Sequence, residues 1–242
     1  MSGHWLFIGA NSDIAVAMAR QLGDHNVSRV TLLSRNAAEL DRRRADIEAR
    51  LQVDVDVIAL DLSDDAASDG YFDECELPDV AVVAAGVLRD TADLDESPES
   101  TRDVIRTNYE AVIAPTETLA RRMRERGSGT IVGLSSVAGL RGRPSNYVYG
   151  STKAAMNAYL DGLRLRCQDS GVKVFTALIG MVATKMTAGK ELPAPVTATP
   201  DDVATAILSA LRRGKSRAYC PGYRRWIMSI VRMMPGIVVK RM

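Results

Sequence analysis

The stretch YVYGSTKAAMNAYL, residues 147–160, contains a tyrosine and a lysine whose spacing permits acid–base chemistry. Tyr149 and Lys153 are four residues apart, so on a helix both side chains lie on the same face. A lysine ammonium beside a phenol favours the phenolate and lowers a tyrosine pKa that starts at about 10. Tyr147 is six residues from Lys153 and falls out of phase, which makes Tyr149 the stronger candidate for a general acid or base.

Two other polar residues precede this pair at positions that invite a chemical role. The run RTNYEA places Asn108 inside a helical pattern, where asparagine is a poor helix former unless its side chain has another function. The run GLSSVAG places Ser136 directly after an apolar stretch with the composition of a strand. We therefore expect Asn108, Ser136, Tyr149 and Lys153 to meet if the strands form a parallel sheet, because ligand sites in such sheets lie beyond the carboxyl ends of the strands.

The elements that must position these residues are short apolar runs that alternate with amphipathic stretches. The expected strands are WLFIG, RVTLLS, VDVIAL, VAVVAAG, GTIVGLSS, VKVFTAL and SRAYC. This alternation is typical of βαβ units, and continuous apolar runs indicate a sheet covered on both faces. No linker or repeat divides the 242 residues, of which 46% are hydrophobic. We predict one α/β domain over residues 1–221, a doubly wound parallel Rossmann sheet with helices on both faces, followed by an amphipathic helical tail over 222–242.

Composition excludes several classes of protein. The formal net charge of +1 gives no global attraction to nucleic acid. Three scattered cysteines and two histidines form neither a disulfide framework nor a zinc motif, so we expect buried thiols and no metal. The N-terminus lacks the basic start and the apolar run of a signal peptide, which predicts a cytoplasmic protein.

The stretch IGANSDIAVAMA has the form of a phosphate-binding turn. A glycine ends the first strand, and the helix that follows offers free N–H groups and a dipole to an anionic diphosphate. Only the first glycine of a G-x-x-x-G-x-G pattern is present, because Asp13 and Ala15 occupy the other places. A carboxylate at Asp13 would cap the helix but would repel a diphosphate if it pointed inward. The cofactor candidates here are Gly9, Asn11, Ser12, Asp13 and Ile14, with a capped strand–turn–helix as the alternative.

The ends of the second and third strands favour a phosphorylated dinucleotide. Ser34 and Arg35 stand where an acid would otherwise bind the adenosine ribose, and a guanidinium suits a 2′-phosphate. We therefore expect NADP(H), with NAD(H) as a second cofactor and a solvated Arg35 as the alternative. Asp61 and Leu62 are expected to meet the adenine, unless Asp61 caps the next helix.

Over nearly its whole length the chain resembles the short-chain dehydrogenase/reductase family. The resemblance rests on Y-x-x-x-K, on a serine thirteen residues before that tyrosine, and on an asparagine twenty-eight residues before the serine. It implies that Tyr149 is the general acid/base and that Lys153 holds the nicotinamide ribose and lowers the tyrosine pKa. It also implies that Ser136 binds the substrate oxygen and that Asn108 keeps a water in a proton relay.

The same resemblance extends to IGMVATKM, where the family has P-G-x-V-x-T, and assigns Val182 and Thr184 to the carboxamide and diphosphate; here Ile179 replaces the proline. The family's N-A-G after strand four is replaced by Ala84, Ala85 and Gly86, which removes a side chain that braces the sheet. We include these three residues in the cofactor site. The departures fall on residues around the cofactor and not on the four catalytic candidates.

The tail after residue 221 is not explained by the core of the family. Trp226, Ile230 and Met233 recur at helical spacing, and residues 222–242 contain five basic residues and no acid. Such a segment suits the surface of a membrane, or alternatively a partner subunit in a homo-oligomer. With NYVYGSTKA and MVATKM, the tail makes the chain similar to the decaprenylphosphoryl-2-keto-ribose reductase branch, whose substrates are lipid-linked sugars.

These patterns predict an oxidoreductase that transfers hydride between NADP(H) and a carbonyl or secondary alcohol. The branch resemblance implies a polyprenyl-phosphate-linked keto-sugar as the substrate and contact with the inner face of a membrane. Two alternatives stay open: a reductase of a 3-oxoacyl thioester or other hydrophobic ketone, and a catalytically silent NADP(H)-binding sensor or scaffold.

Overall fold

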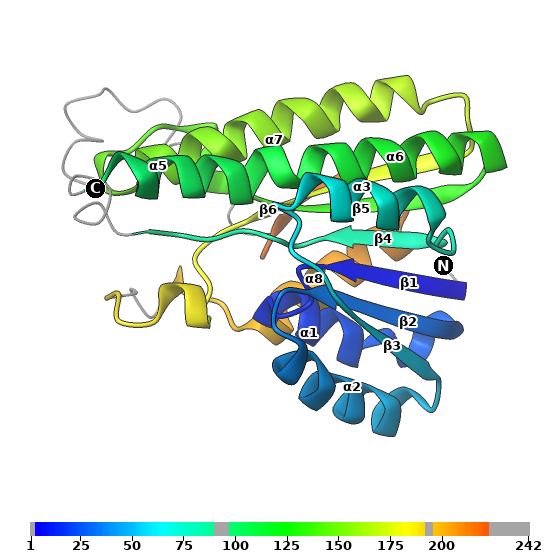
Figure 1. The fold of residues 1–242 in the computed structure, drawn as a ribbon. Helices are drawn as coiled ribbons and strands as arrows, with labels where there is room; N and C mark the ends of the chain where they lie inside the picture. Colours follow the sequence, from blue (N-terminus) through cyan, green and yellow to red (C-terminus); the bar gives the residue numbers. More distant parts are fainter. Residues whose placement is uncertain (1–2, 90–96, 192–195, 223–242) are drawn as a thin grey trace.

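Seven parallel strands form one sheet in the order β3-β2-β1-β4-β5-β6-β7 (Figure 1). The computed structural model describes residues 3–89, 97–191 and 196–222. The strands are β1 (Gly3–Ile8), β2 (Val27–Ser34), β3 (Asp54–Ala59), β4 (Val80–Val83), β5 (Gly129–Ser136), β6 (Val172–Ile179) and β7 (Arg217–Cys220). Each overlaps one of the apolar runs, so the prediction of a doubly wound α/β fold is confirmed.

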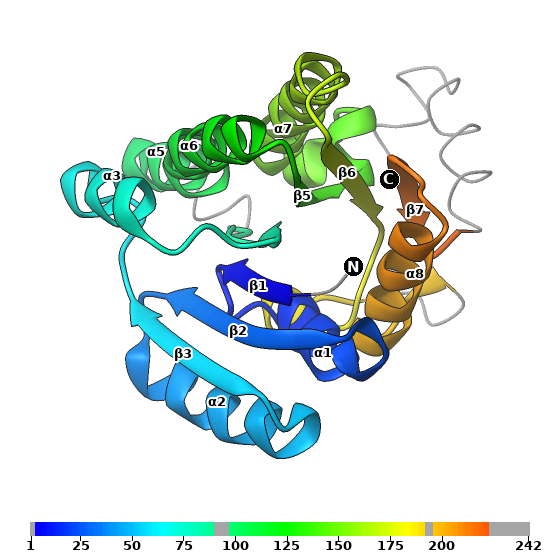
Figure 2. The same cartoon turned by 90° about the vertical axis from the view of Figure 1, so that its right-hand side faces the viewer.

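Helices cover both faces of the sheet (Figure 2). One face carries α1 (Asp13–Arg20), α2 (Ala37–Leu51) and α8 (Pro200–Arg212). The other carries α3 (Asp65–Glu74), α5 (Pro98–Ile105), α6 (Ala111–Arg126) and α7 (Tyr147–Arg166). Short turns of 3₁₀ helix are η1 (Leu22–His25), η3 (Val137–Leu140), η4 (Pro144–Asn146) and η5 (Lys185–Thr187), and η2 (Arg106–Glu110) is a π-helical turn.

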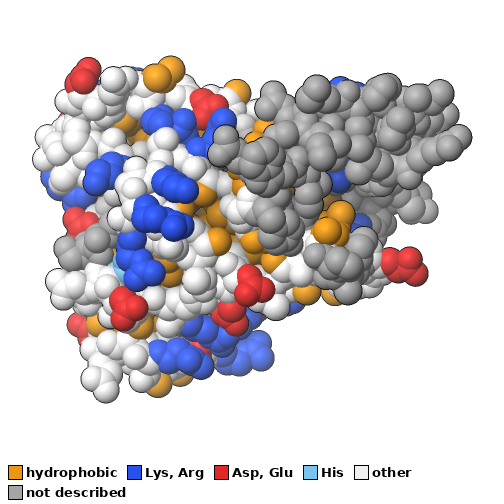
Figure 3. Space-filling model, turned by 180° about the vertical axis from the view of Figure 1, so that it is seen from behind, with side chains coloured by type: hydrophobic (Ala, Val, Ile, Leu, Met, Phe, Trp, Pro, Cys, Tyr) orange, Lys and Arg blue, Asp and Glu red, His pale blue; other side chains and the backbone are white. Residues whose placement is uncertain are grey.

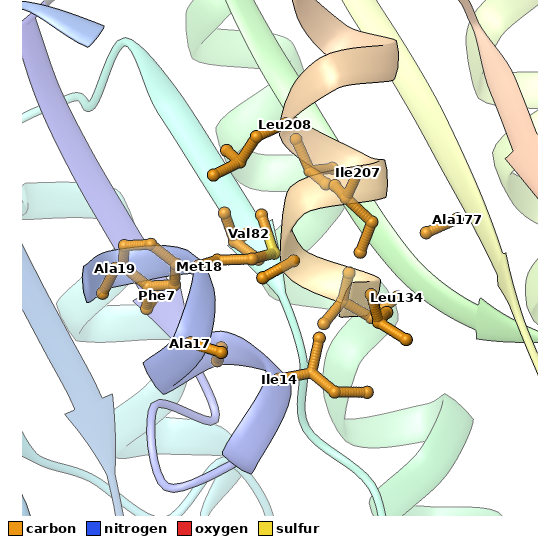
Figure 4. Close-up of a cluster of buried hydrophobic side chains, with 14 of the residues drawn as sticks. Phe7, Ile14, Ala17, Met18, Ala19, Val82, Leu134, Ala177, Ile207 and Leu208 are labelled. Carbon is orange, nitrogen blue, oxygen red and sulfur yellow. The ribbon is translucent and has the colours of Figure 1, made fainter. Parts of the chain in front are cut away.

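The two faces explain why the strands are continuously apolar. In β1, Trp5 and Phe7 belong to the hydrophobic cluster beneath α1 and α8, whereas Leu6 and Ile8 belong to the cluster beneath α6 and α7. Figure 4 shows the first cluster, in which Phe7 from the sheet lies near Met18 of α1. Successive strand residues point to opposite faces of the sheet, and both faces are covered by helices. A polar side chain on either face would lose its water on burial, so residues 5 to 8 are apolar on both faces.

The helix starts are set by polar caps. Ser12, Asn36, Asp64 and Thr199 accept a hydrogen bond from a backbone N–H in the first turns of α1, α2, α3 and α8, respectively. Each cap satisfies an amide that has no partner within the helix. Because each helix follows a strand, these caps fix where the chain turns at the carboxyl end of the sheet.

The surface charges and the burial of the cysteines agree with most of what the composition predicts. Both signs of charge are interspersed with small apolar areas on the face seen from behind (Figure 3), in keeping with the net charge near zero. Cys167 and Cys220 are buried, as expected, but Cys75 is only partly buried.

Within the described ranges, no helix is long and apolar enough to cross a bilayer. The tail predicted for 222–242 lies, beyond Gly222, outside the described residues.

Candidate active site

A cavity of about 340 Å³ opens at the carboxyl ends of β1 to β4. This size falls within the range of pockets that bind small molecules and cofactors. Its lining includes most of the residues proposed from the sequence: Gly9, Asn11, Ser12, Asp13, Ile14, Ser34, Arg35, Asp61, Leu62, Ala84, Ala85, Gly86 and Thr184. The fold therefore gathers side chains and backbone from five separate turns around one space.

Gly9 lets the first turn approach the backbone that follows β4. Its φ is +82°, and a Cβ on it would lie 2.5 Å from the Ala85 nitrogen. The amides of Gly9 and Ala10 both donate to the Leu33 carbonyl, at 2.9 and 3.0 Å. A side chain at residue 9 would be strained and would collide with the neighbouring turn. This close turn has the form that a dinucleotide's diphosphate requires.

The N-terminus of α1 faces the same cavity and is open to an anion. Ser12 is the cap, and its Oγ accepts from the Ala15 amide at 3.5 Å. Among the described residues, the amides of Asp13 and Ile14 have no acceptor. The expectation that Asp13 caps the helix is wrong. Its carboxylate instead accepts from the Lys185 amide at 2.7 Å, outside its own helix.

Arg35 and Asp61 face each other across the end of the cavity beyond β2 and β3. The Arg35 side chain is 59% exposed, and its Nη1 lies 4.0 Å from Asp61 Oδ2. Asp61 Oδ1 accepts from both the amide and the hydroxyl of Ser63, at 2.9 and 2.7 Å. Partial burial acts against ionisation, but these bonds from Ser63 keep the pKa of Asp61 below its usual value. The alternative that Asp61 caps the next helix is wrong, because Asp64 caps α3.

Asn108 is fully buried in the π-helical turn between α5 and α6. Its Oδ1 accepts from the Val87 amide at 2.6 Å, and its Nδ2 donates to the Val87 carbonyl at 2.8 Å. Nδ2 also lies 3.4 Å from Thr152 Oγ1 on α7. These contacts join three segments that are distant in sequence, and they account for an asparagine inside a helical pattern. Single π-helical turns occur often at functional sites.

Lys153 lies behind Gly86, which lines the cavity. The residue is 4% exposed, and its Nζ donates to the Leu134 carbonyl at 3.4 Å. A Cβ on Gly86 would lie 3.2 Å from Asn108 Oδ1 and 3.5 Å from Lys153 Nζ, so this glycine keeps the space between the two polar groups free of a side chain. Burial disfavours the ammonium and lowers the pKa of Lys153 to about 8.

Tyr149 lies beside Lys153 on the inner face of α7, with Lys153 Nζ 5.7 Å from its ring centre. Although the ring is partly accessible to solvent, the surrounding protein is dense enough that burial raises the pKa of Tyr149 to about 12. A hydrogen bond with Ser136 acts in the opposite direction. The sequence-based expectation of a lowered tyrosine pKa is therefore wrong for this structure, because loss of water outweighs the hydrogen bond with Ser136.

Ser136 is held at the end of β5 by its neighbours. Its hydroxyl donates to the Ile179 carbonyl at 3.1 Å and accepts from the Ala138 amide at 3.1 Å. Ile179, where the family has proline, continues β6 and pairs with Ser136 and Cys220. Ser136 and Tyr149 thus meet at one edge of the sheet, as the spacing predicted.

Two glycines that the sequence analysis did not single out bring the serine and tyrosine segments together. A Cβ on Gly139 in η3 would lie 2.5 Å from the Ala154 nitrogen and 2.7 Å from the Lys153 carbonyl oxygen. A Cβ on Gly150 would lie 3.0 Å from the Ala138 carbonyl oxygen. The turn after Ser136 therefore packs directly on the backbone of α7. For Gly150 the sequence signal was available, since glycine inside a helix is unfavourable without a packing reason.

The remaining predicted residues separate into two groups. Thr184 lines the cavity, whereas the Val182 side chain is buried in the core and pairs through its backbone with Ala198. Tyr147 is 51% exposed at the start of α7, as expected for the lesser candidate. The cavity also includes residues that sequence reasoning missed, namely Leu33, Leu60, Ser63, Val87, Thr107, Ala111, Lys185 and Met186. Many of these are apolar and lack a chemical signature, so only their position in the fold identifies them.

The cavity lining contains the anion-binding turn but not Asn108, Ser136, Tyr149 or Lys153. The buried amine of Lys153 adjoins the cavity at Gly86, and the Tyr149 phenol and the Ser136 hydroxyl lie beside that amine. Within the described part of the chain, no cluster of histidine, cysteine and acidic residues has the form of a metal site. The arrangement suits proton transfer to a substrate beside an anionic dinucleotide.

Comparison with known proteins gives matches along most of the chain. The short chain dehydrogenase profile matches residues 4–193. The uncharacterized oxidoreductase Rv2073c of Mycobacterium tuberculosis is 33% identical over 242 residues, which covers 98% of this chain and 96% of the relative.

Two solved structures have the same fold. A short-chain dehydrogenase from Sphingobium yanoikuyae in complex with NADPH has a TM-score of 0.83 at 23% identity, covering 97% of this chain and 98% of the other. A 3-oxoacyl-[acyl-carrier protein] reductase from Brucella melitensis has a TM-score of 0.74 at 25% identity, covering 85% of this chain and 82% of the other.

Proposed function

Since the chain belongs to the short-chain dehydrogenase family and is an oxidoreductase that acts on CH–OH or C=O groups with NAD(P), we propose that it is an NADPH-dependent reductase of a lipid-linked carbonyl. The observation that most supports this function is the meeting of Ser136, Tyr149 and Lys153 beside a cavity with a dinucleotide-binding turn. A silent sensor would have no need for this set of groups.

The cofactor fits the cavity by several independent features. Gly9 permits close approach of the backbone, and the free amides at the start of α1 suit a diphosphate. Arg35 is available to a 2′-phosphate because it is largely exposed and only loosely paired with Asp61. When bound, NADPH supplies the hydride. The NADPH found in the Sphingobium yanoikuyae structure supports the same choice here.

The chain's own residues supply the proton. With a pKa of about 12, the Tyr149 phenol is neutral at physiological pH and can donate its proton to the oxygen of a carbonyl. Ser136, fixed by Ile179 and Ala138, would hold that oxygen by a hydrogen bond. Lys153, mostly charged at pH 7, would stabilise the phenolate left after proton transfer and bind the cofactor ribose. Stabilisation of the phenolate lowers the barrier of the reducing direction.

Asn108 has a supporting role in this proposal. Its amide is fully used by the Val87 backbone and Thr152, so it fixes the π-helical turn beside Lys153. A water held near this turn would return a proton toward Tyr149 by way of Lys153. The hydrogen bonds leave the turn few alternative positions.

For the substrate, we propose a polyprenyl-phosphate-linked keto-sugar. The support is the branch resemblance, together with the apolar and basic composition of residues 222–242. We propose that this tail, following the catalytic domain of residues 1–221, holds a cytoplasmic homo-oligomer at a membrane surface. The second candidate substrate is a 3-oxoacyl thioester, which the similarity to the Brucella melitensis reductase favours.

The substrate proposal is tested by two measurements on the same strain and protein. Mass spectrometry of lipids after deletion of the gene is expected to show accumulation of a keto-sugar polyprenyl phosphate. NADPH oxidation by the purified enzyme is expected to respond to that lipid and not to a 3-oxoacyl thioester. Turnover of the thioester with no change in the lipids would support the second candidate instead.

A further inference from the structure

Asp13 occupies a place where the family pattern has glycine, and its carboxylate is used outside its own helix. Asp13 Oδ2 accepts a hydrogen bond from the Lys185 amide at 2.7 Å. Lys185 begins η5, the turn that follows β6, whereas Asp13 begins α1. The bond therefore ties the phosphate-binding turn to a segment 172 residues later in the chain.

The bond belongs to a ring of alternating charges. Asp13 Oδ1 lies 3.9 Å from both Arg43 Nη2 and Lys185 Nζ. Glu39 on α2 pairs with Arg43 at 3.1 Å and also with the Lys185 ammonium. The side chains of Asp13, Glu39 and Arg43 are only 20–22% exposed, so water screens them less than an open surface pair. The ring joins α1, α2 and η5.

The segment that contains η5 has a separate attachment at its other side. The Ala183 amide donates to the Ala198 carbonyl at 3.0 Å, and the Ala198 amide donates to the Met181 carbonyl at 3.1 Å. The Thr187 hydroxyl donates to the Val182 carbonyl at 2.7 Å. These contacts tie the base of the segment to Ala198, which precedes α8, and shape the turn, but none of them reaches α1. Among the described residues, the Asp13 carboxylate binds the backbone of this turn to α1, and the ion pair between Lys185 and Glu39 adds a side-chain link to α2.

Thr184, Lys185 and Met186 line the cavity from this segment. We propose that Asp13 is a positioning residue: its carboxylate holds η5 against α1 and so keeps the wall of the cofactor cavity in place before the cofactor binds, an inference that rests on the proposed function of that cavity. A carboxylate directed at Lys185 is also neutralised by two cations, which reduces its repulsion of a diphosphate. The residue thus replaces the family's glycine without closing the site.

The first test measures the turn itself and needs no cofactor. Hydrogen exchange of peptides that contain the Lys185 amide is compared in the wild type, Asp13→Ala and Asp13→Asn. Loss of a charge-assisted hydrogen bond predicts exchange faster by a factor on the order of ten to a hundred in Asp13→Ala. Asp13→Asn keeps an acceptor oxygen and is expected to restore most of the protection. Glu39→Gln is the matched control, because it weakens the ring but leaves the bond to the Lys185 amide.

Peptides from α8 provide the reference for global unfolding in each variant. Faster exchange at Lys185 with unchanged exchange in α8 supports the proposal. Unchanged exchange at Lys185 in Asp13→Ala overturns it, and so does equal acceleration throughout the protein.

The second test measures NADPH binding by fluorescence titration. Asp13→Ala is expected to weaken binding severalfold, and Asp13→Asn is not. If both variants bind NADPH more tightly, the carboxylate acts only by repelling the diphosphate, and the positioning role is overturned. If the wild type binds no NADPH, the proposed cofactor fails, while the exchange experiment still decides the role of Asp13.

Discussion

Replacing Lys153 with methionine should abolish turnover and yet make the protein more stable at neutral pH. Methionine has a similar length, so the change removes the charge with little change in packing. Burial lowers the pKa of Lys153 from 10.5 to about 8, and each pKa unit corresponds to about 1.4 kcal/mol. Keeping a protonated lysine in the folded state therefore lowers the unfolding free energy by about 3 kcal/mol. Its long bond to the Leu134 carbonyl offsets only part of this.

The pH dependence follows from the same difference. Below pH 8 the lysine is protonated in both states, and the full cost is present. Between pH 8 and 10.5 the unfolded chain binds more protons at this site than the folded one, so the wild type gains stability as the pH rises. The advantage of Lys153→Met should be largest below pH 8, at about 1–3 kcal/mol, and should decline to nothing by pH 10.5.

Urea unfolding of both proteins at several pH values measures this difference, and NADPH oxidation measures turnover. Lys173→Met is the control, because Lys173 is an exposed residue of β6. We expect the control to change neither stability nor activity. If Lys153→Met is less stable than the wild type at pH 7, or if its advantage grows between pH 8 and 10.5, the reasoning about the buried ammonium is refuted.

Three other changes test neighbouring parts of the account. Gly139→Ala places a Cβ 2.5 Å from the backbone of α7, so it should lower the unfolding free energy by about 1–3 kcal/mol and kcat by roughly a hundredfold. The control Gly142→Ala, with nothing within 4 Å of its Cβ, should change neither. Wild-type kcat in both variants would contradict the packing argument. Arg35→Ala should weaken NADPH binding by about 1.5–3 kcal/mol and NADH binding much less. Titrations with both cofactors measure this difference, and equal losses would exclude a 2′-phosphate contact. Truncation after Pro221 should abolish sedimentation with anionic vesicles while preserving turnover of a short ketone, whereas dissociation of an oligomer would instead show subunit packing.

The sheet was predictable because burial on both faces leaves a strong mark in sequence. Strands such as β1 and β4 are apolar at successive positions, and polar residues appear just where β2 and β5 end. The convergence of Ser136, Tyr149 and Lys153 was predictable for the same reason, since parallel strands bring their carboxyl ends to one edge. In both cases the pattern is local and the topology has few alternatives.

Long-range contacts and solvation were not predictable in this way. Nothing near Asp13 in the sequence indicates that its carboxylate meets Lys185, because the partner is on another crossover. The pKa of Tyr149 depends on how much protein surrounds the phenol, and the spacing to Lys153 gives only the favourable charge. Gly139 is informative only when the helix it contacts is known.

Steady-state kinetics of Tyr149→Phe test the central claim most directly. The change removes the phenolic proton and leaves the ring, so kcat for NADPH-dependent reduction should fall by about 10²–10⁴-fold. Binding of NADPH should stay within about twofold of the wild type, because the turn at Gly9 and α1 is untouched. Tyr147→Phe, on the exposed side of the same helix, should retain full activity. Wild-type turnover by Tyr149→Phe would contradict the account.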